Sequence, residues 1–322
     1  MSSEKRFRAS VTQPIEHELD IDWTLALAGG EGQRLKAYVE QRHGQRVPKQ
    51  YCQLLGSRSM LEHTLERLNR LTPAARTLTV IGTEHGAFAH PQLAGRSDHV
   101  FCQPSSRDTG VALYVALAMI KRWAPNATVT VTPTDHYVAP SARYVDRLRL
   151  ARNVATRLRD RVVILGVRPS EPDSDLGYVT PSGCLTEVPE ARSVASFVEK
   201  PAIDRAAQLV ADGALWNTMV TCGTIDALWS LGAETQPDLL AMLDSLVPLV
   251  GTPDESDAID YIYRQHGPVS FSTDMLTRAP GRLALIELDG VDWSDWGRPE
   301  RVETVLALRR ARAGGQALDR RA

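Results

Sequence analysis

The chain has 322 residues, 43% of them hydrophobic and 24% charged, which is typical of a globular protein long enough to bury a large core. Its formal net charge of −2 excludes a global attraction to nucleic acid or to an anionic membrane, so any phosphate-binding charge must be local. The four cysteines are far apart and follow no metal-binding spacing, so we expect reduced thiols that act as small hydrophobic residues.

Residues 1–21 are polar and charged and show no signal-peptide pattern. The longest apolar stretch, Val111 to Ile120, is shorter than the roughly 20 residues that cross a bilayer. We therefore predict a soluble, cytoplasmic protein with no membrane partner. Its expected organisation is a leader at 1–21, one domain at 22–313 and a frayed tail at 314–322.

Apolar runs alternate with amphipathic segments through residues 22–168. Strands are expected at residues 23–28, 77–81, 99–102, 128–131 and 162–167. Helices are expected at residues 60–71, 111–123 and 144–158. This alternation predicts an α/β fold with a twisted, mostly parallel sheet flanked by helices.

The pattern is looser in residues 169–313, which we expect to form a second half of the same domain. Strands are expected at residues 194–198 and 283–288. Helices are expected at residues 203–211, 225–231, 238–247 and 256–265, and a last helix begins at Pro299.

A glycine-rich turn follows the first expected strand, where residues 27–35 read L-A-G-G-E-G-Q-R-L. It is not a dinucleotide-binding fingerprint, because Leu35 replaces the third glycine and Gln50 replaces the acidic residue. A P-loop pattern is absent from the sequence. Backbone N–H groups with Arg34 and Lys49 could cradle a polyphosphate, although a plain turn with solvated basic residues would read the same way.

Two aspartates form a second candidate site. Asp135 follows an expected strand, and Asp295 lies in a turn between Trp293 and Trp296. Ligands of open α/β sheets bind beyond the carboxyl ends of the strands, where Asp135 would lie. Two carboxylates with water and phosphate oxygens are typical of a Mg²⁺ site, although each aspartate alone would more often be a cap or turn residue.

The chain resembles the sugar-phosphate nucleotidyltransferases in seven short motifs and in their order. The motifs are L-A-G-G-E-G-Q-R-L, P-K-Q, R-D-T-G, P-T-D-H, V-E-K-P, W-N and W-S-D-W-G. The mannose-1-phosphate guanylyltransferase branch is the most similar one, and the resemblance covers roughly residues 23–308. It implies a Rossmann-like nucleotidyltransferase fold, with a sugar-binding portion in the same domain. It also implies that GMP passes from GTP to mannose 1-phosphate, with Mg²⁺ as cofactor and pyrophosphate as the second product.

The resemblance also implies roles for individual residues. It assigns Arg34, Lys49 and Asp135 to catalysis, and Asp135 and Asp295 to the metal. The nucleotide would contact Gly29, Gly30, Gly32, Gln103, Arg107, Asp108, Thr109 and Gly110. The hexose 1-phosphate would contact Gly177, Glu199, Lys200 and Asn217.

The chain departs from the family pattern at three places, one of which is Leu176, where the common motif T-x-Y-G-Y-I has an aromatic residue and this chain reads S-D-L-G-Y-V. The motif W-N-S-G-M reads W-N-T-M-V at residues 216–220, so Met219 replaces a glycine and could bring a side chain close to the sugar. The charged stretch at residues 36–47 is slightly longer than usual, and we expect a flap over the triphosphate there.

Two alternatives to this function stay open on the sequence. One is the same chemistry with another nucleoside triphosphate or another sugar 1-phosphate. Another is a catalytically silent sensor of sugar nucleotides, which the change at Met219 would favour. The arginines of the expected helix at 144–158 indicate a solvated face rather than a nucleic-acid site. The oligomeric state is open, a homodimer included.

Overall fold

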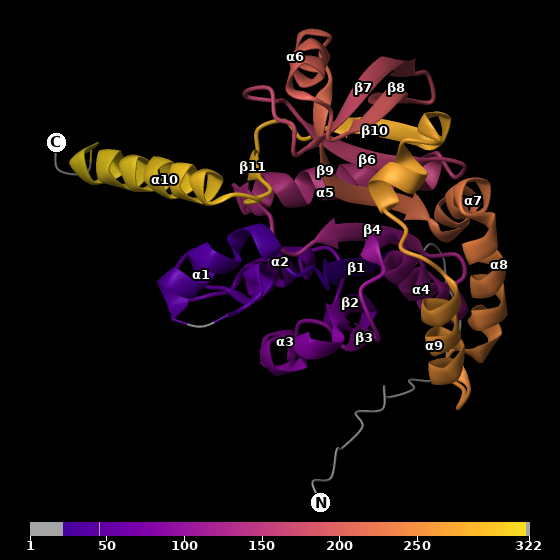
Figure 1. Cartoon of the computed structure of the whole chain (residues 1–322). Coiled ribbons are helices and arrows are strands. Elements are labelled where there is room, and N and C mark those ends of the chain that lie inside the picture. Colours follow the sequence, from indigo (N-terminus) through magenta and orange to yellow (C-terminus); the bar gives the residue numbers. More distant parts are fainter. Residues whose placement is uncertain (1–21, 45, 320–322) are drawn as a thin grey trace, which may run out of the picture.

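The computed structural model describes residues 22–44 and 46–319 (Figure 1). The leader at 1–21 and residues 320–322 of the expected tail therefore lie outside the described part of the chain.

A nine-stranded sheet forms the centre of the molecule, with the strand order β3-β2-β1-β4-β9-β6-β10-β8-β7. Only β8 and β9 run against the direction that the other strands of this sheet share. The predicted α/β fold with a mostly parallel sheet is confirmed. The strands are β1 Asp22–Ala28, β2 Thr77–Gly82, β3 His99–Gln103, β4 Thr128–Pro133, β6 Val162–Val167, β7 Gly177–Leu185, β8 Val188–Glu199, β9 Leu215–Thr224 and β10 Leu283–Glu287.

Helices cover both faces of this sheet (Figure 1). On one face pack α2 Met60–Leu68, α3 Gly86–Leu93 and α5 Ser141–Arg157. On the other face pack α4 Asp108–Trp123, α7 Ile225–Thr235, α8 Pro237–Leu246 and α9 Glu255–Gln265. Because α4 lies between the sheet and α7–α9, it is buried from Gly110 to Ile120, which explains its apolar sequence on every side.

Several elements were not predicted. They are α1 Lys36–His43, α3, β7, β9, β5 Tyr137–Ala139 and β11 Asp292–Ser294. The flap expected at residues 36–47 is wrong in its first part, because α1 is a helix that packs next to α10 Pro299–Asp319. Arg42 of α1 makes a 3.2 Å ion pair with Glu303 of α10.

Strand β9 was not predicted, because it is buried on both faces and yet carries polar residues. Asn217, Thr218 and Thr221 are each 4% exposed or less. A strand that alternates apolar and polar residues is usually half exposed, and a fully buried strand is usually apolar. The sequence of β9 matches neither pattern.

The small sheet of β5 and β11 joins two distant parts of the chain. Ser294 pairs with Tyr137 at the end of this antiparallel ladder, so the next residues, Asp295 and His136, leave the ladder at the same end. Trp296 is fully buried in a left-handed conformation (φ 47°) and stacks on Tyr137 with ring centroids 5.4 Å apart. The turn that carries Asp295 is therefore held against the segment that carries Asp135.

Two expectations about the chain as a whole can be compared with the described residues. All four cysteines are free thiols, but only Cys52 and Cys222 are buried, while Cys102 and Cys184 are exposed. Among residues 22–44 and 46–319, every helix is too short or too polar to cross a lipid bilayer. The backbone of α10 continues to Asp319, through most of the stretch expected to fray.

Candidate active site

The predicted site residues gather where the strand order of the sheet reverses. The chain places β2 and β3 on one side of β1 and then β4 on the other, so a crevice opens beyond the carboxyl ends of β1 and β4. Gly29 follows β1 directly, and Asp135 lies two residues beyond β4. Such a switch point is where open α/β sheets bind their ligands.

A cavity of about 400 Å³ lies beside this crevice, a volume suited to a small-molecule ligand. Its walls come from the ends of β1, β2 and β3 and from the first turn of α4. Among the predicted nucleotide-binding residues, the cavity is lined by Gly29, Gly30, Gln103, Asp108 and Thr109.

Buried polar side chains hold the glycine turn in place. Gln50 donates to the carbonyl oxygens of Ala28 (2.7 Å) and Gly30 (2.8 Å). Gln103 lies so close to Gly29 that a Cβ there would come within 2.5 Å of its amide nitrogen. Gly32 has a φ of 58°, a conformation that favours glycine, so this turn requires glycine at Gly32 and tight packing at Gly29.

Two residues of the predicted nucleotide-binding loop point away from the cavity. Arg107 donates from Nε to the carbonyl of Tyr263 in α9, at 2.9 Å. Gly110 donates its N–H to the carbonyl of Val269, at 2.7 Å, and packs closely on that residue. Both residues anchor the loop, whereas Asp108 and Thr109 face the cavity.

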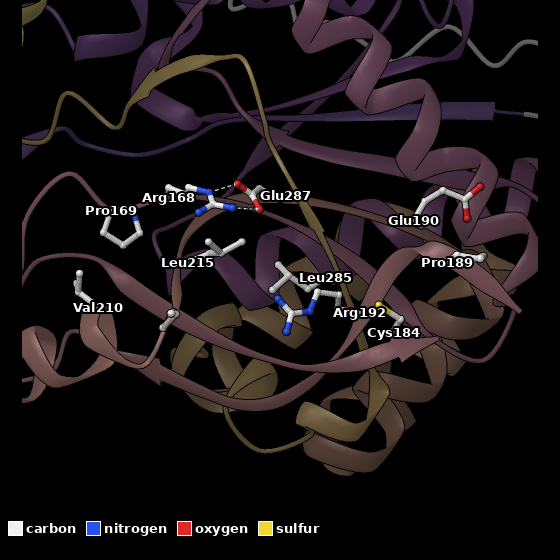
Figure 2. Close-up of a pocket in the computed structure, with 12 residues that line it drawn as sticks. Arg168, Pro169, Cys184, Pro189, Glu190, Arg192, Val210, Leu215, Leu285 and Glu287 are labelled. Atoms are coloured by element: carbon white, nitrogen blue, oxygen red, sulfur yellow. Dashed lines mark hydrogen bonds and ion pairs between the residues drawn. The ribbon is translucent and has the colours of Figure 1, made fainter. Parts of the chain in front are cut away.

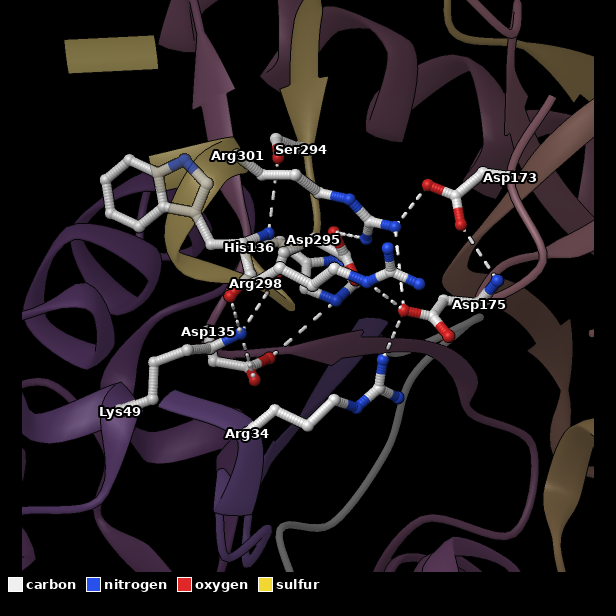
Figure 3. Close-up of polar contacts among 11 residues, drawn as sticks. Arg34, Lys49, Asp135, His136, Asp173, Asp175, Ser294, Asp295, Arg298 and Arg301 are labelled. Carbon is white, nitrogen blue, oxygen red and sulfur yellow. Dashed lines mark hydrogen bonds and ion pairs between the residues drawn. The ribbon is translucent and has the colours of Figure 1, made fainter. Parts of the chain in front are cut away.

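Lys49 lies at the centre of the site, and its side chain is only 5% exposed. Its Nζ is 2.8 Å from Oδ2 of Asp135 and donates to the carbonyl of Asp295 at 2.7 Å (Figure 3). It also donates to the carbonyl of Trp296 at 3.3 Å. One buried ammonium thus links the segment after β4 to the turn after β11.

The carboxylates of Asp135 and Asp295 border the same space. Burial lowers the pKa of His136, while both carboxylates act in the opposite direction, so each lies within electrostatic reach of the imidazole. Burial raises the pKa of Asp135, but Lys49 and His136 together outweigh burial and hold that pKa below its usual value. Asp135 is therefore ionised at neutral pH.

The two carboxylates do not form a complete metal site by themselves. No cluster of three or more potential ligands occurs among His, Cys, Asp and Glu side chains of the described residues. Oδ2 of Asp135 faces Lys49, and Oδ1 of Asp295 lies 2.5 Å from Nη1 of Arg301. Two carboxylates fit Mg²⁺, which keeps several waters and takes its other ligands from substrate phosphates.

Arginines and aspartates form a network at the mouth of the crevice (Figure 3). Arg301 of α10 bonds both Asp295 and Asp173. Oδ2 of Asp175 accepts hydrogen bonds from Arg34 at 2.7 Å and from Arg298 at 2.5 Å. The loop before β7 is thereby connected to the glycine turn and to the start of α10.

The predicted sugar-site residues meet on the other side of the crevice. Gly177 pairs with Glu199, and the next residue of β7 pairs with the residue before Asn217. A Cβ at Gly177 would lie 2.5 Å from Oε2 of Glu199, so the glycine makes room for that carboxylate. Burial raises the pKa of Glu199, Lys200 lowers it, and Asp108 adds to the increase. The effect of Asp108 places its carboxylate within electrostatic reach of Glu199.

Met219 is held in a left-handed conformation with a φ of 60°, in the position where the family motif has glycine. Its sulfur accepts from Nδ2 of Asn217 at 3.3 Å and from the hydroxyl of Ser272 at 3.0 Å. The thioether thus occupies a donor of Asn217, one of the residues predicted for the sugar site.

Four site residues were missed from the sequence, namely Gln50, Asp175, Arg298 and Arg301. Three of them lie within three residues of a predicted site residue, and Arg301 lies six residues after Asp295. Their roles depend on contacts with segments more than a hundred residues away, or on carbonyls of another loop. Local spacing has no signal for such contacts.

A second cavity, of about 520 Å³, lies apart from this site, between β7, β8, β10 and α6 Ile203–Ala211 (Figure 2). Arg168 pairs with Glu287 at its rim. None of its lining residues was predicted to be functional.

Comparison with known proteins agrees with the architecture. The family model described as nucleotidyl transferase matches residues 24–301. A mannose-1-phosphate guanylyltransferase of Klebsiella pneumoniae is 26% identical over 276 residues, which are 84% of this chain and 57% of that protein. The chain thus spans little more than half the length of this curated relative.

Solved structures show the same fold. One described as mannose-1-phosphate geranyltransferase from Thermus thermophilus has a TM-score of 0.75 at 27% identity, covering 86% of this chain and 76% of that chain. UDP-glucose pyrophosphorylase in complex with UDP-glucose has a TM-score of 0.55 at 13% identity, covering 90% of this chain and 99% of that chain. At this low identity, the similarity to UDP-glucose pyrophosphorylase shows a shared fold and nothing more.

Proposed function

Because this chain belongs to the nucleotidyl transferase family, we propose that it transfers the nucleotidyl group of a nucleoside triphosphate to a sugar 1-phosphate. A phosphate oxygen of the sugar attacks the α-phosphorus, the bond to the β-phosphate breaks, and pyrophosphate leaves. The nucleotide is GTP and the acceptor is mannose 1-phosphate, as in the Klebsiella relative. The observation that supports this most is the meeting of Lys49, Asp135 and Asp295 beside a nucleotide-sized cavity.

The chemistry needs no general base, because a sugar phosphate is already ionised near neutral pH. The obstacle is repulsion between two polyanions, about 4 kcal/mol for unit charges 4 Å apart at an effective dielectric of 20. Lys49 is a fixed and desolvated cation that can stabilise the negative charge developing on the α-phosphate in the transition state. Arg34 and Lys200, each with a side chain 53% exposed, can approach the phosphates from either side of the crevice.

We infer that Asp135 and Asp295 hold Mg²⁺ together with the phosphates. Bound there, the ion would neutralise phosphate charge. Asp135 would exchange its contact with Lys49 for the metal, which would leave the ammonium free to face the substrate.

Pyrophosphate release tests the proposed function. Five nucleoside triphosphates (GTP, dTTP, UTP, CTP and ATP) are crossed with mannose, glucose and other hexose 1-phosphates in the presence of Mg²⁺. We expect the fastest release with GTP and mannose 1-phosphate. Fastest release with another pair would keep the reaction and replace the substrates. If no pair gave pyrophosphate release, and the protein still bound a sugar nucleotide, the result would favour a catalytically silent sensor.

Met219 offers a test of the acceptor site. Replacing it with glycine removes the thioether from Asn217 and frees that amide to bond a sugar hydroxyl. One gained hydrogen bond corresponds to a KM for mannose 1-phosphate that is lower by about threefold to tenfold, with the KM for GTP unchanged. Met219→Ala is the matched control, because it removes the thioether but keeps a Cβ at positive φ. A change in the KM for GTP alone would contradict the placement of Met219 on the acceptor side.

A further inference from the structure

Three guanidinium groups from two distant segments of the chain converge on one carboxylate oxygen. Around Oδ2 of Asp175 lie Arg34 at 2.7 Å, Arg298 at 2.5 Å and Arg301 at 3.9 Å (Figure 3). Arg34 comes from the turn after β1, Arg298 from the turn before α10, and Arg301 from the first turn of α10. Guanidinium groups bind phosphate oxygens in the same way as carboxylate oxygens. The position of Asp175 Oδ2 is therefore suited to an oxygen of a phosphate.

The arginines differ in how firmly they are held. Arg301 is 18% exposed and also bonds Asp173 and Asp295, so it is part of the framework. The side chains of Arg34 and Arg298 are 53% and 46% exposed. Among the residues that the structure describes, Asp175 is the one side-chain partner of each. These two arginines can accept a new anion without leaving the framework unsatisfied.

The Asp175 carboxylate can separate from Arg34 and Arg298. Its side chain is 22% exposed and those of the two arginines are 53% and 46% exposed, so water can solvate the partners once they separate. The backbone N–H of Asp175 bonds to Oδ1 of Asp173, a contact that does not depend on the Asp175 side chain. The loop can thus keep its form while that carboxylate moves.

We propose that Arg298 joins Arg34 in binding the β- and γ-phosphates of the nucleotide, and that Asp175 occupies this phosphate site until they arrive. The proposal rests on the proposed function, because it assigns the pair to the part of the triphosphate that leaves as pyrophosphate. Asp175 also precedes Gly177 by two residues, so its carboxylate would move next to the residues of the proposed sugar side while the loop keeps its form.

Binding of inorganic pyrophosphate, measured by calorimetry without added metal, tests the proposal. Arg298→Gln removes a cation and should weaken binding by about tenfold. Asp175→Asn removes the internal competitor and should tighten binding by about threefold or more. Tighter binding in Asp175→Asn together with weaker binding in Arg298→Gln is the decisive result. A residue that only shapes the site would weaken binding when replaced.

Arg168 and Glu287 provide the matched control, an exposed arginine–carboxylate pair outside this site. Arg168→Gln and Glu287→Gln should leave pyrophosphate binding unchanged. Asp175→Ser serves as a second variant if Asp175→Asn unfolds at a lower temperature than the wild type. Weaker or unchanged binding in both Asp175 variants, or unchanged binding in Arg298→Gln, would overturn the proposal.

The outcome is separate from that of the proposed function. If the wild type turned over no pair of substrates, pyrophosphate binding and its response to the two changes would still be measurable. If it turned over GTP and mannose 1-phosphate but Arg298→Gln bound pyrophosphate normally, only the assignment of Arg298 and Asp175 would fail.

Discussion

Asp135→Asn is expected to lower kcat by about 10³-fold or more at every magnesium concentration, because a neutral amide is a poor ligand for a hard cation. Asp295→Asn should have an effect of the same kind, since the two carboxylates border one space. Steady-state pyrophosphate release across a magnesium titration measures both variants. Substrate binding should also lose its magnesium dependence, which a titration of GTP followed by calorimetry would detect without turnover.

The Asp135 variant should remain folded. Lys49 keeps two carbonyl acceptors, on Asp295 and Trp296, after its charged partner is removed. Asp146→Asn is the matched control, because Asp146 makes an exposed ion pair with Arg149 on α5, away from the crevice. Circular dichroism and thermal unfolding check the fold of both proteins. Near wild-type rates in Asp135→Asn throughout the titration would refute the metal assignment.

Lys49→Met should reduce kcat by about 10² to 10³-fold, the usual result of removing one preorganised group that stabilises transition-state charge. The same change should lower the free energy of unfolding by about 2 kcal/mol. The loss stays small because the Asp135 side chain is 32% exposed, so water can solvate part of its charge. Single-turnover kinetics and denaturant unfolding measure the two effects.

The double variant Lys49→Met/Asp135→Asn separates the two roles of the lysine. Removing both charges should restore part of the lost stability, because neither group is then left with an unpaired charge. It should restore no activity. Lys121→Met is a suitable control, since Lys121 lies over the ring of Trp229, outside the crevice. Activity of Lys49→Met within tenfold of the wild type would exclude Lys49 from the chemical step.

The sequence was most informative where structure is local. Helix α4 and strands β1, β2, β4 and β6 were predicted because their residues are buried by immediate neighbours in regular patterns. The glycine turn and Asp135 were identified because a strand end places them at one edge of the sheet. Strand β9 was missed, since its buried asparagine and threonines follow no apolar pattern.

Contacts between distant segments were decided by the tertiary structure alone. Asp295 reaches Asp135 only because β11 pairs with β5, and a ladder of three residues has no pattern of its own in the sequence. Asp175 meets Arg34 across 141 residues and Arg298 across 123. The sequence by itself determined the fold class, the family motifs and the residues that we propose to bind the phosphates. Which charges neutralise each other before a ligand binds depends on side-chain distances of a few ångströms, and only the folded chain sets these distances.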